Sequence, residues 1–149
     1  MADVPRMESL AHPYRWPTLD EMLQKTDRII VGRVGAQKLA VVTEGERQRE
    51  YLVSMVSEGD RDFIVAQATD LVCTNDGVGL GYTVNEPLLE VGETYAILVT
   101  TDEPVRGAYI VLPQILRDEG GWLNNLSTLS VDEQALSLNE LWERYESQR

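Results

Sequence analysis

The strongest hydrophobic pattern in the chain lies in residues 94–99, where β-branched, aromatic and aliphatic residues follow one another without a charge. A run of this length is too short for a free-standing helix, and its composition is typical of a strand buried on both faces. Gly92 comes shortly before the run, and residues 100–104 follow it with turn-forming side chains. The pattern predicts a buried strand around which the rest of the chain is organised.

Shorter apolar runs on either side of this strand predict the rest of a sheet. Asp76-Gly77 is the clearest hairpin signal between them, because this pair tolerates the positive φ angles of tight turns. We expect a bend at Gly35 and the end of the last hairpin pairing at Pro113. Trp122 either begins a final short strand or anchors a loop. The predicted strands cover residues 29–34, 39–43, 51–56, 63–66, 71–74, 78–84 and 106–112.

Two capping boxes predict a short helix before the strands and another after them. Thr18 with Glu21, and Ser137 with Glu140, have the spacing of an N-cap hydroxyl and a glutamate three residues later. The first helix should end near Asp27. The second has an apolar stripe of Leu138, Leu141, Trp142 and Tyr145. Residues 124–136, which precede this helix, are expected to form a loop anchored by Leu126, Leu129 and Val131.

This order of elements predicts a mainly β fold in a single domain over residues 18–149, preceded by an irregular arm, 1–17, that prolines punctuate. Closely spaced strands without intervening helices favour a small antiparallel barrel of the oligonucleotide/oligosaccharide-binding (OB-like) type, flanked by the two short helices. A β-sandwich is the alternative.

The layout resembles a group of small bacterial accessory domains built on an OB-like barrel. Those domains open with a helix and an aspartate–apolar–glycine strand, as residues 18–34 do, and enter a later strand through a motif like Leu89-Glu90-Val91-Gly92-Glu93-Thr94-Tyr95. The resemblance covers residues 18–145 and ends in a helix like 137–145. It implies a binding or accessory module and carries over no catalytic residue. Such domains often follow a secretion signal, which this sequence lacks.

The net charge of −12 changes what the chain is expected to bind. A field of that sign repels nucleic-acid phosphates, so direct DNA or RNA binding is disfavoured and a protein partner, if charged, is expected to be basic. No apolar run is long enough to span a membrane. The compartment stays open: cytoplasmic if the chain is complete, cell envelope or secreted if a signal peptide was removed.

Motifs for catalysis, metals and cofactors are absent from the sequence. Cys73 is the single cysteine and is expected to be a small buried strand residue, and His12 is the single histidine, so zinc sites of the usual kinds are excluded. The glycine-rich segment 77–81 has no lysine nearby and is interpreted as a flexible hairpin rather than a phosphate loop. We therefore expect no enzymatic activity, no metal and no cofactor.

Aromatic residues outside the predicted sheet are the remaining candidates for a binding site. Tyr14 and Trp16 lie in the arm, Trp122 follows a double glycine, and Trp142 lies in the last helix. Each either pins a peripheral segment onto the domain or forms an exposed anchor for a partner, since tryptophan and tyrosine are enriched at interface hot spots. The first hypothesis is a non-catalytic protein-interaction or accessory module that binds through the arm, the acidic surface or both.

Two alternatives belong to other functional classes. An acidic inhibitor that imitates nucleic acid would rest on the charge alone. A carboxylate-dependent hydrolase would need two of the 25 acidic residues to face one cleft, and no pair stands out in the sequence.

Overall fold

The computed structural model describes residues 6–9, 17–74, 77–83, 86–101, 105–128 and 134–149. Within them, nine strands are accompanied by the helices α1 (Leu19–Lys25) and α2 (Leu138–Ser147). The strands are β1 (Arg6–Ser9), β2 (Arg28–Glu44), β3 (Arg47–Glu58), β4 (Arg61–Thr74), β5 (Gly77–Thr83), β6 (Thr94–Thr100), β7 (Tyr109–Glu119), β8 (Trp122–Asn125) and β9 (Ala135–Leu136).

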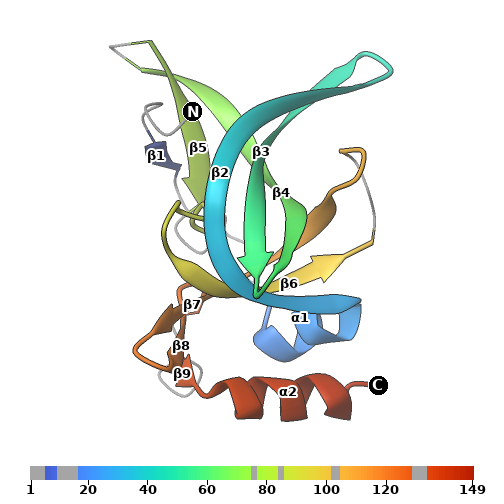
Figure 1. The fold of residues 1–149 in the computed structure, drawn as a ribbon. Helices are drawn as coiled ribbons and strands as arrows, with labels where there is room; N and C mark the ends of the chain where they lie inside the picture. The colour runs from blue at the N-terminus through green and yellow to red at the C-terminus, as the bar shows by residue number, and fades with distance from the viewer. Residues whose placement is uncertain (1–5, 10–16, 75–76, 84–85, 102–104, 129–133) are drawn as a thin grey trace.

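Five of these strands close on themselves into a ring. β2 pairs antiparallel with β3 and β6, β3 with β4, and β6 with β7. The ring closes where β4 and β7 run parallel, with Val65 opposite Tyr109 and Ala66 opposite Ile110. Figure 1 shows that the β2–β3 hairpin extends well past the ring. The predicted mainly antiparallel β fold with two flanking helices is confirmed, as a ring-like closed sheet rather than a clean barrel.

The described strands form one sheet rather than the two that a β-sandwich requires. β5 continues the ring strand β4 outward as a hairpin, and β8 and β9 continue β7 in the same way. Both extensions share their hydrogen-bond ladders with the ring. The described strands therefore do not form the β-sandwich that was the alternative prediction.

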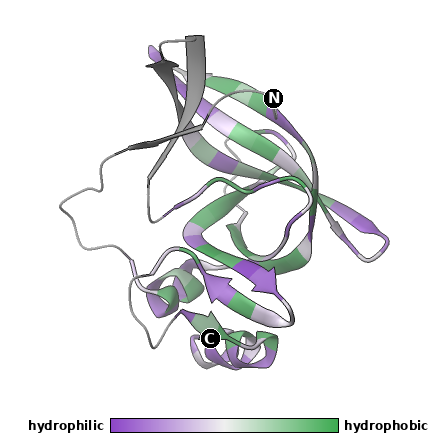
Figure 2. Ribbon diagram, turned by 90° about the vertical axis from the view of Figure 1, so that its left-hand side faces the viewer, coloured by the Kyte–Doolittle hydropathy of each residue, from purple (hydrophilic) through white to green (hydrophobic). Residues whose placement is uncertain are grey.

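The central strand β6 is buried on both faces, as its sequence predicts. Tyr95, Ile97 and Val99 pack with residues from all the other ring strands, so this cluster fills the ring. Ala96 and Leu98 point to the opposite face and pack with the two helices. Figure 2 shows hydrophobic and hydrophilic residues alternating along several strands. β6 thus separates an inner core from an outer one.

Both helices begin at the predicted capping residues and cover the outer core. The Thr18 hydroxyl accepts a hydrogen bond from the Glu21 amide at 3.2 Å, and Ser137 accepts one from Glu140 at 3.1 Å. Apolar residues of both helices lie in the same cluster as Leu98. A 3.0 Å salt bridge from Arg144 to Asp20 joins the two helices.

The bend predicted at Gly35 is confirmed, but residues 28–44 form one strand instead of two. The pairing of β2 with β3 shifts register between Val34 and Gln37, which lets one long strand turn across the ring. Gly32 lies just before this bend, where β2 pairs with β6 on one side and the backbone of β3 approaches closely on the other.

The prediction that Pro113 ends the hairpin pairing is wrong, because β7 continues through it to Glu119. The pairing of β6 with β7 shifts register here, from Val99 opposite Val111 to Ile97 opposite Ile115. Pro113 lies in the extra residues of this irregularity. A proline lacks only the backbone N–H, which the ladder does not use at a bulge.

The segment 1–17, predicted to be irregular, contains the short strand β1. It pairs in parallel with β5, with Arg6 opposite Leu80 and Ser9 opposite Thr83. Cys73 lies in β4, on a strand as predicted. Several residues named from the sequence lie outside the described residues: His12, Tyr14, Trp16, Leu129 and Val131.

Candidate functional site

The β3–β4 part of the ring carries apolar side chains on both of its faces. Val56 and Val65 point inward to the ring core, whereas Tyr51, Val53 and Ala66 form a separate apolar cluster on the outside. Neighbouring residues of a strand point to opposite faces, so the same two strands supply both sets. Residues of the segment 105–110 pack on this outer cluster.

A groove of about 220 Å³ crosses this outer face. Its floor consists of Val53 and Met55 of β3 and Ile64 of β4, and Met55 and Ile64 are opposite each other in the strand pairing. Met55 is 39% exposed and Ile64 is 46% exposed. The floor is thus an apolar surface that the described part of the chain leaves open to solvent.

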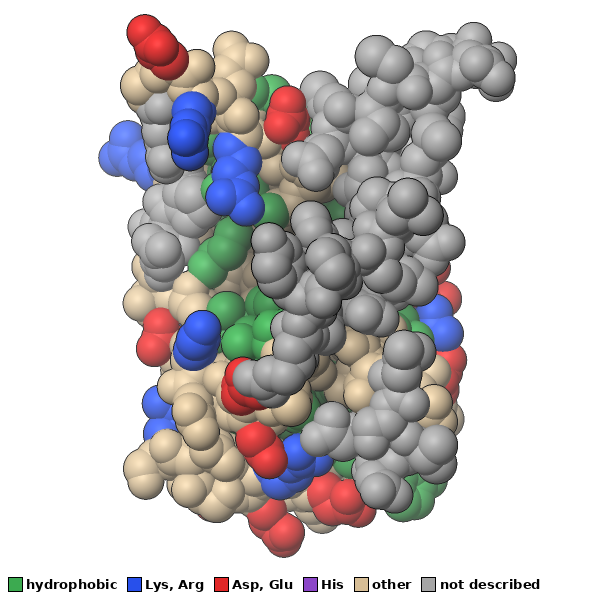
Figure 3. Space-filling view, turned by 180° about the vertical axis from the view of Figure 1, so that it is seen from behind, with side chains coloured by type: hydrophobic (Ala, Val, Ile, Leu, Met, Phe, Trp, Pro, Cys, Tyr) green, Lys and Arg blue, Asp and Glu red, His purple; other side chains and the backbone are tan. Residues whose placement is uncertain are grey.

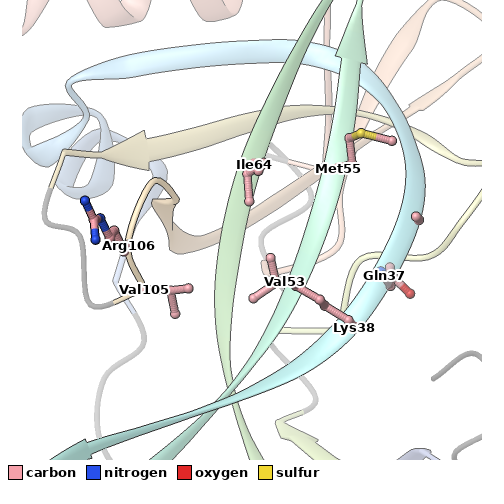
Figure 4. A pocket seen from close by; sticks show the side chains of 8 residues that line it. Gln37, Lys38, Val53, Met55, Ile64, Val105 and Arg106 are labelled. Atoms are coloured by element: carbon pink, nitrogen blue, oxygen red, sulfur yellow. The ribbon is translucent and has the colours of Figure 1, made fainter.

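The two walls of the groove come from segments far apart in the sequence. β2 supplies one wall with Ala36, Gln37 and Lys38, and the segment after β6 supplies the other with Val105 and Arg106. Figure 4 shows Lys38 on one side of the floor residues and Arg106 on the other. The groove therefore depends on the closure of the ring, which brings these two segments to either side of β3 and β4.

The charged residues that line the groove, among those described, are both basic. Lys38 and Arg106 are exposed, and neither makes a salt bridge within the described part of the chain. Figure 3 shows hydrophobic side chains between Lys and Arg side chains on the rear face, below the tip of the β2–β3 hairpin. This local charge is opposite in sign to the net charge of −12.

Two glutamines fix the wall on the β2 side. The Gln37 side-chain amide donates to the Leu89 carbonyl at 2.6 Å and to the Ser54 hydroxyl at 3.0 Å. Buried Gln67 donates to the Pro87 carbonyl at 2.8 Å and accepts from the Leu89 amide at 3.0 Å. The segment 87–89 is thereby held against β2 and β4, and Gln37 on the wall is anchored by its side chain.

Comparison with known proteins gives no relative from which a function could be transferred. No protein-family model, curated protein or solved structure matches the chain. The resemblance to OB-like accessory domains therefore stays a prediction. Any function has to be argued from the side chains of the structure.

Neither Trp122 nor Trp142, the two described tryptophans predicted to contact a partner, lines this groove. Trp122 lies in β8 and is 55% exposed. Trp142 lies in α2, is 36% exposed and packs edge-to-face with Tyr145, with ring centroids 5.8 Å apart. Both belong to the end of the molecule that carries α2 in Figure 1, away from the β2–β3 hairpin. Their role as partner anchors stays a prediction.

The groove was not recognised from the sequence because the apolar residues on the two faces of β3 and β4 all resemble core residues. The run Tyr51-Leu52-Val53-Ser54-Met55-Val56 contains apolar residues at odd and even positions, unlike a strand with one solvated face. This continuous apolar pattern is the signal that could have indicated that the outer face of the strand is also covered, by another part of the protein or by a ligand. The walls carry no such signal, since they meet only through the ring closure.

Other sites for chemistry are scarce in the described residues. No group of three or more His, Cys, Asp or Glu residues could hold a metal ion there. A second hollow, of about 290 Å³, includes Arg33, Ser57 and Val91 in its lining, and no described carboxylate lines either hollow. Neither α1 nor α2 is long and apolar enough to cross a membrane.

One carboxyl group outside the groove is strongly perturbed. Burial raises the pKa of Glu86 from 4.5 to about 7, and the positive charge of Arg49 opposes part of this rise. The folded protein therefore binds more protons than the unfolded chain between these two pH values. The stability contributed by protonated Glu86 is complete below pH 4.5 and is lost as the pH rises through about 7.

Replacing Glu86 with glutamine should remove this pH dependence. We expect the Glu86→Gln variant to gain about 2 to 3 kcal/mol of unfolding free energy relative to the wild type between pH 5 and pH 8, because the wild type must bury a charge at the higher pH. Urea unfolding of both proteins at the two pH values measures the change. Parallel pH curves would contradict a raised pKa at this position.

Proposed function

We propose that the chain is a non-catalytic protein-interaction module that binds its partner in the groove on the outer face of β3 and β4. The observation that carries this proposal is the exposed cross-strand pair Met55 and Ile64 on the floor. Apolar side chains left exposed in a preformed hollow lose water only when another molecule covers them, and that burial favours binding.

The size and chemistry of the groove favour a protein partner over other ligands. About 220 Å³ is less than the roughly 300–1,000 Å³ of typical cofactor and small-molecule pockets, and it suits one or two apolar side chains. Its described lining has no aromatic ring on which a nucleic-acid base could stack, and the net charge of −12 opposes phosphate binding. We therefore expect no direct nucleic-acid binding.

The other two hypotheses receive less support. Imitation of nucleic acid rests on the net charge alone, whereas the charged residues in the described lining of the groove are basic. A hydrolase would need two carboxylates facing one hollow, and neither described hollow has even one in its lining. A non-catalytic role fits the groove better.

Substitution of Ile64 tests the proposal. We expect Ile64→Asp to weaken binding of a partner captured from the native lysate at least about thirty-fold, because a carboxylate would have to be buried in the apolar contact. The matched control is Val91→Asp, which places the same carboxylate at an apolar position that is 52% exposed and outside the groove. Both variants should keep the wild-type circular dichroism spectrum, and the partner's affinity for each is measured by titration calorimetry.

The same experiment distinguishes the groove from the arm and from the exposed tryptophans. A partner that binds Ile64→Asp as tightly as wild type would overturn the proposal. Loss of binding in a Tyr14→Ala, Trp16→Ala double variant or in Trp122→Ala or Trp142→Ala, with Ile64→Asp unaffected, would assign the interface to the residues predicted from the sequence.

A further inference from the structure

The basic residues on the walls of the groove, in addition to its apolar floor, indicate the chemistry of its ligand. Lys38 on β2, which is opposite Val53 in the strand pairing, and Arg106 on the other wall lie on either side of the floor (Figure 4). Because the walls are independent segments, this arrangement is not the periodic repeat of one strand. A ligand on the floor would have a positive charge on each side of it.

These two cations are not balanced within the described part of the chain. No described carboxylate lines the groove, and neither Lys38 nor Arg106 is in a described salt bridge. The chain as a whole has 25 acidic and 13 basic residues, so a hollow lined by two basic residues and no described acid stands out against the overall composition. The complementary ligand is apolar in its centre and negative on both sides.

We propose that the groove binds an acidic segment of a partner protein, in which an apolar side chain lies on Met55 and Ile64 and carboxylates on either side of it pair with Lys38 and Arg106. This inference rests on the proposed function, since it names the partner chemistry of the same groove. It also reverses the expectation from net charge, which would favour a basic partner.

Several features of the groove support a segment of protein chain over a free anionic amphiphile. The cations lie on opposite walls, which suits charges placed before and after a side chain in one sequence. A fatty acid has its single carboxylate at one end and would leave one of the two cations without a partner.

The test uses an array of synthetic peptides. Each peptide has leucine, methionine or phenylalanine at its centre, flanked on both sides by aspartate and glutamate, by asparagine and glutamine, or by lysine. Binding to the full chain is followed by fluorescence anisotropy at low and at high salt. We expect the acid-flanked peptides to bind most tightly, with affinity that falls as salt is added.

Charge reversal assigns that preference to the groove. Lys38→Glu and Arg106→Glu should each weaken binding of the acid-flanked peptides roughly three- to ten-fold and should improve binding of the lysine-flanked ones. The control is Arg33→Glu, which reverses an exposed basic residue of the same strand β2 that does not line the groove. It should leave the order of peptide affinities unchanged.

The outcomes separate this inference from the proposed function. Equal binding of acid-flanked and amide-flanked peptides, or no effect of Lys38→Glu and Arg106→Glu, would overturn the acidic-segment inference. If a captured partner were still lost in Ile64→Asp, the groove would remain the interface with a different ligand chemistry. Binding of decanoate in place of every peptide, weakened by the same two reversals, would assign the groove to an anionic amphiphile and overturn the inference.

Discussion

A single methyl group added at Gly32 is expected to be among the most destabilising small changes in this chain. A Cβ atom there would lie 2.5 Å from the backbone oxygen of Ser57 and 2.8 Å from a methyl carbon of Val56. The backbone oxygen cannot rotate away as a side chain could, so β2 and β3 would have to separate at the point where β2 turns. We expect Gly32→Ala to lower the unfolding free energy by about 3 kcal/mol, measured by urea unfolding.

Gly35 provides a control for this prediction in the same strand. A Cβ atom at Gly35 would meet the Met55 backbone oxygen at 3.5 Å, which is ordinary contact. Gly35→Ala should therefore change stability by less than about 1 kcal/mol. Equal destabilisation by the two substitutions would mean that the loss of unfolding free energy comes from replacing a glycine in a bent strand and not from the close approach to Ser57.

The second large effect is expected at Asn125, which connects a buried polar network. Its side-chain amide donates to the Gln114 side-chain oxygen at 2.9 Å, and its own oxygen accepts from the Ser127 amide at 2.9 Å. Gln114 in turn donates to the Pro17 carbonyl at 2.6 Å. Asn125→Ala would leave buried groups of Gln114 and Ser127 without partners, and we expect it to lower the unfolding free energy by about 2 to 4 kcal/mol.

Asn139→Ala is the control for this substitution, because Asn139 is exposed in the first turn of α2. It should change stability by less than about 0.5 kcal/mol. A double-mutant cycle of Asn125→Ala with Gln114→Leu then measures the coupling. If the two losses were simply additive, the hydrogen bond between these side chains would contribute nothing of its own.

Local signals in the sequence predicted much of this fold. Both helices begin at the capping residues Thr18 and Ser137, because a side-chain hydroxyl and its partner amide are only three residues apart. The strand at residues 94–99 was recognisable because its burial on both faces leaves no polar alternation. Such features depend on neighbours in sequence.

Features that depend on distant pairing were not recognisable in this way. The parallel contact of β4 with β7 joins residues more than 40 positions apart, and nothing local in either strand indicates it. The same closure supplies the second wall of the groove at Val105 and Arg106. Pro113 was misjudged for a related reason, because whether a proline ends a strand depends on the register of its partner, which shifts between Ile97 and Val99.

The central claim is that the partner contacts the outer face of β3 and β4, and photo-crosslinking tests it most directly. A photoreactive benzoylphenylalanine is placed at the position of Ile64, Val91, Trp122 or Trp142 in the full chain, which is then irradiated in the native lysate. The account predicts a discrete crosslinked partner from position 64, whose yield falls when an excess of acid-flanked peptide is added. Crosslinks from position 122 or 142 with none from position 64 would contradict it.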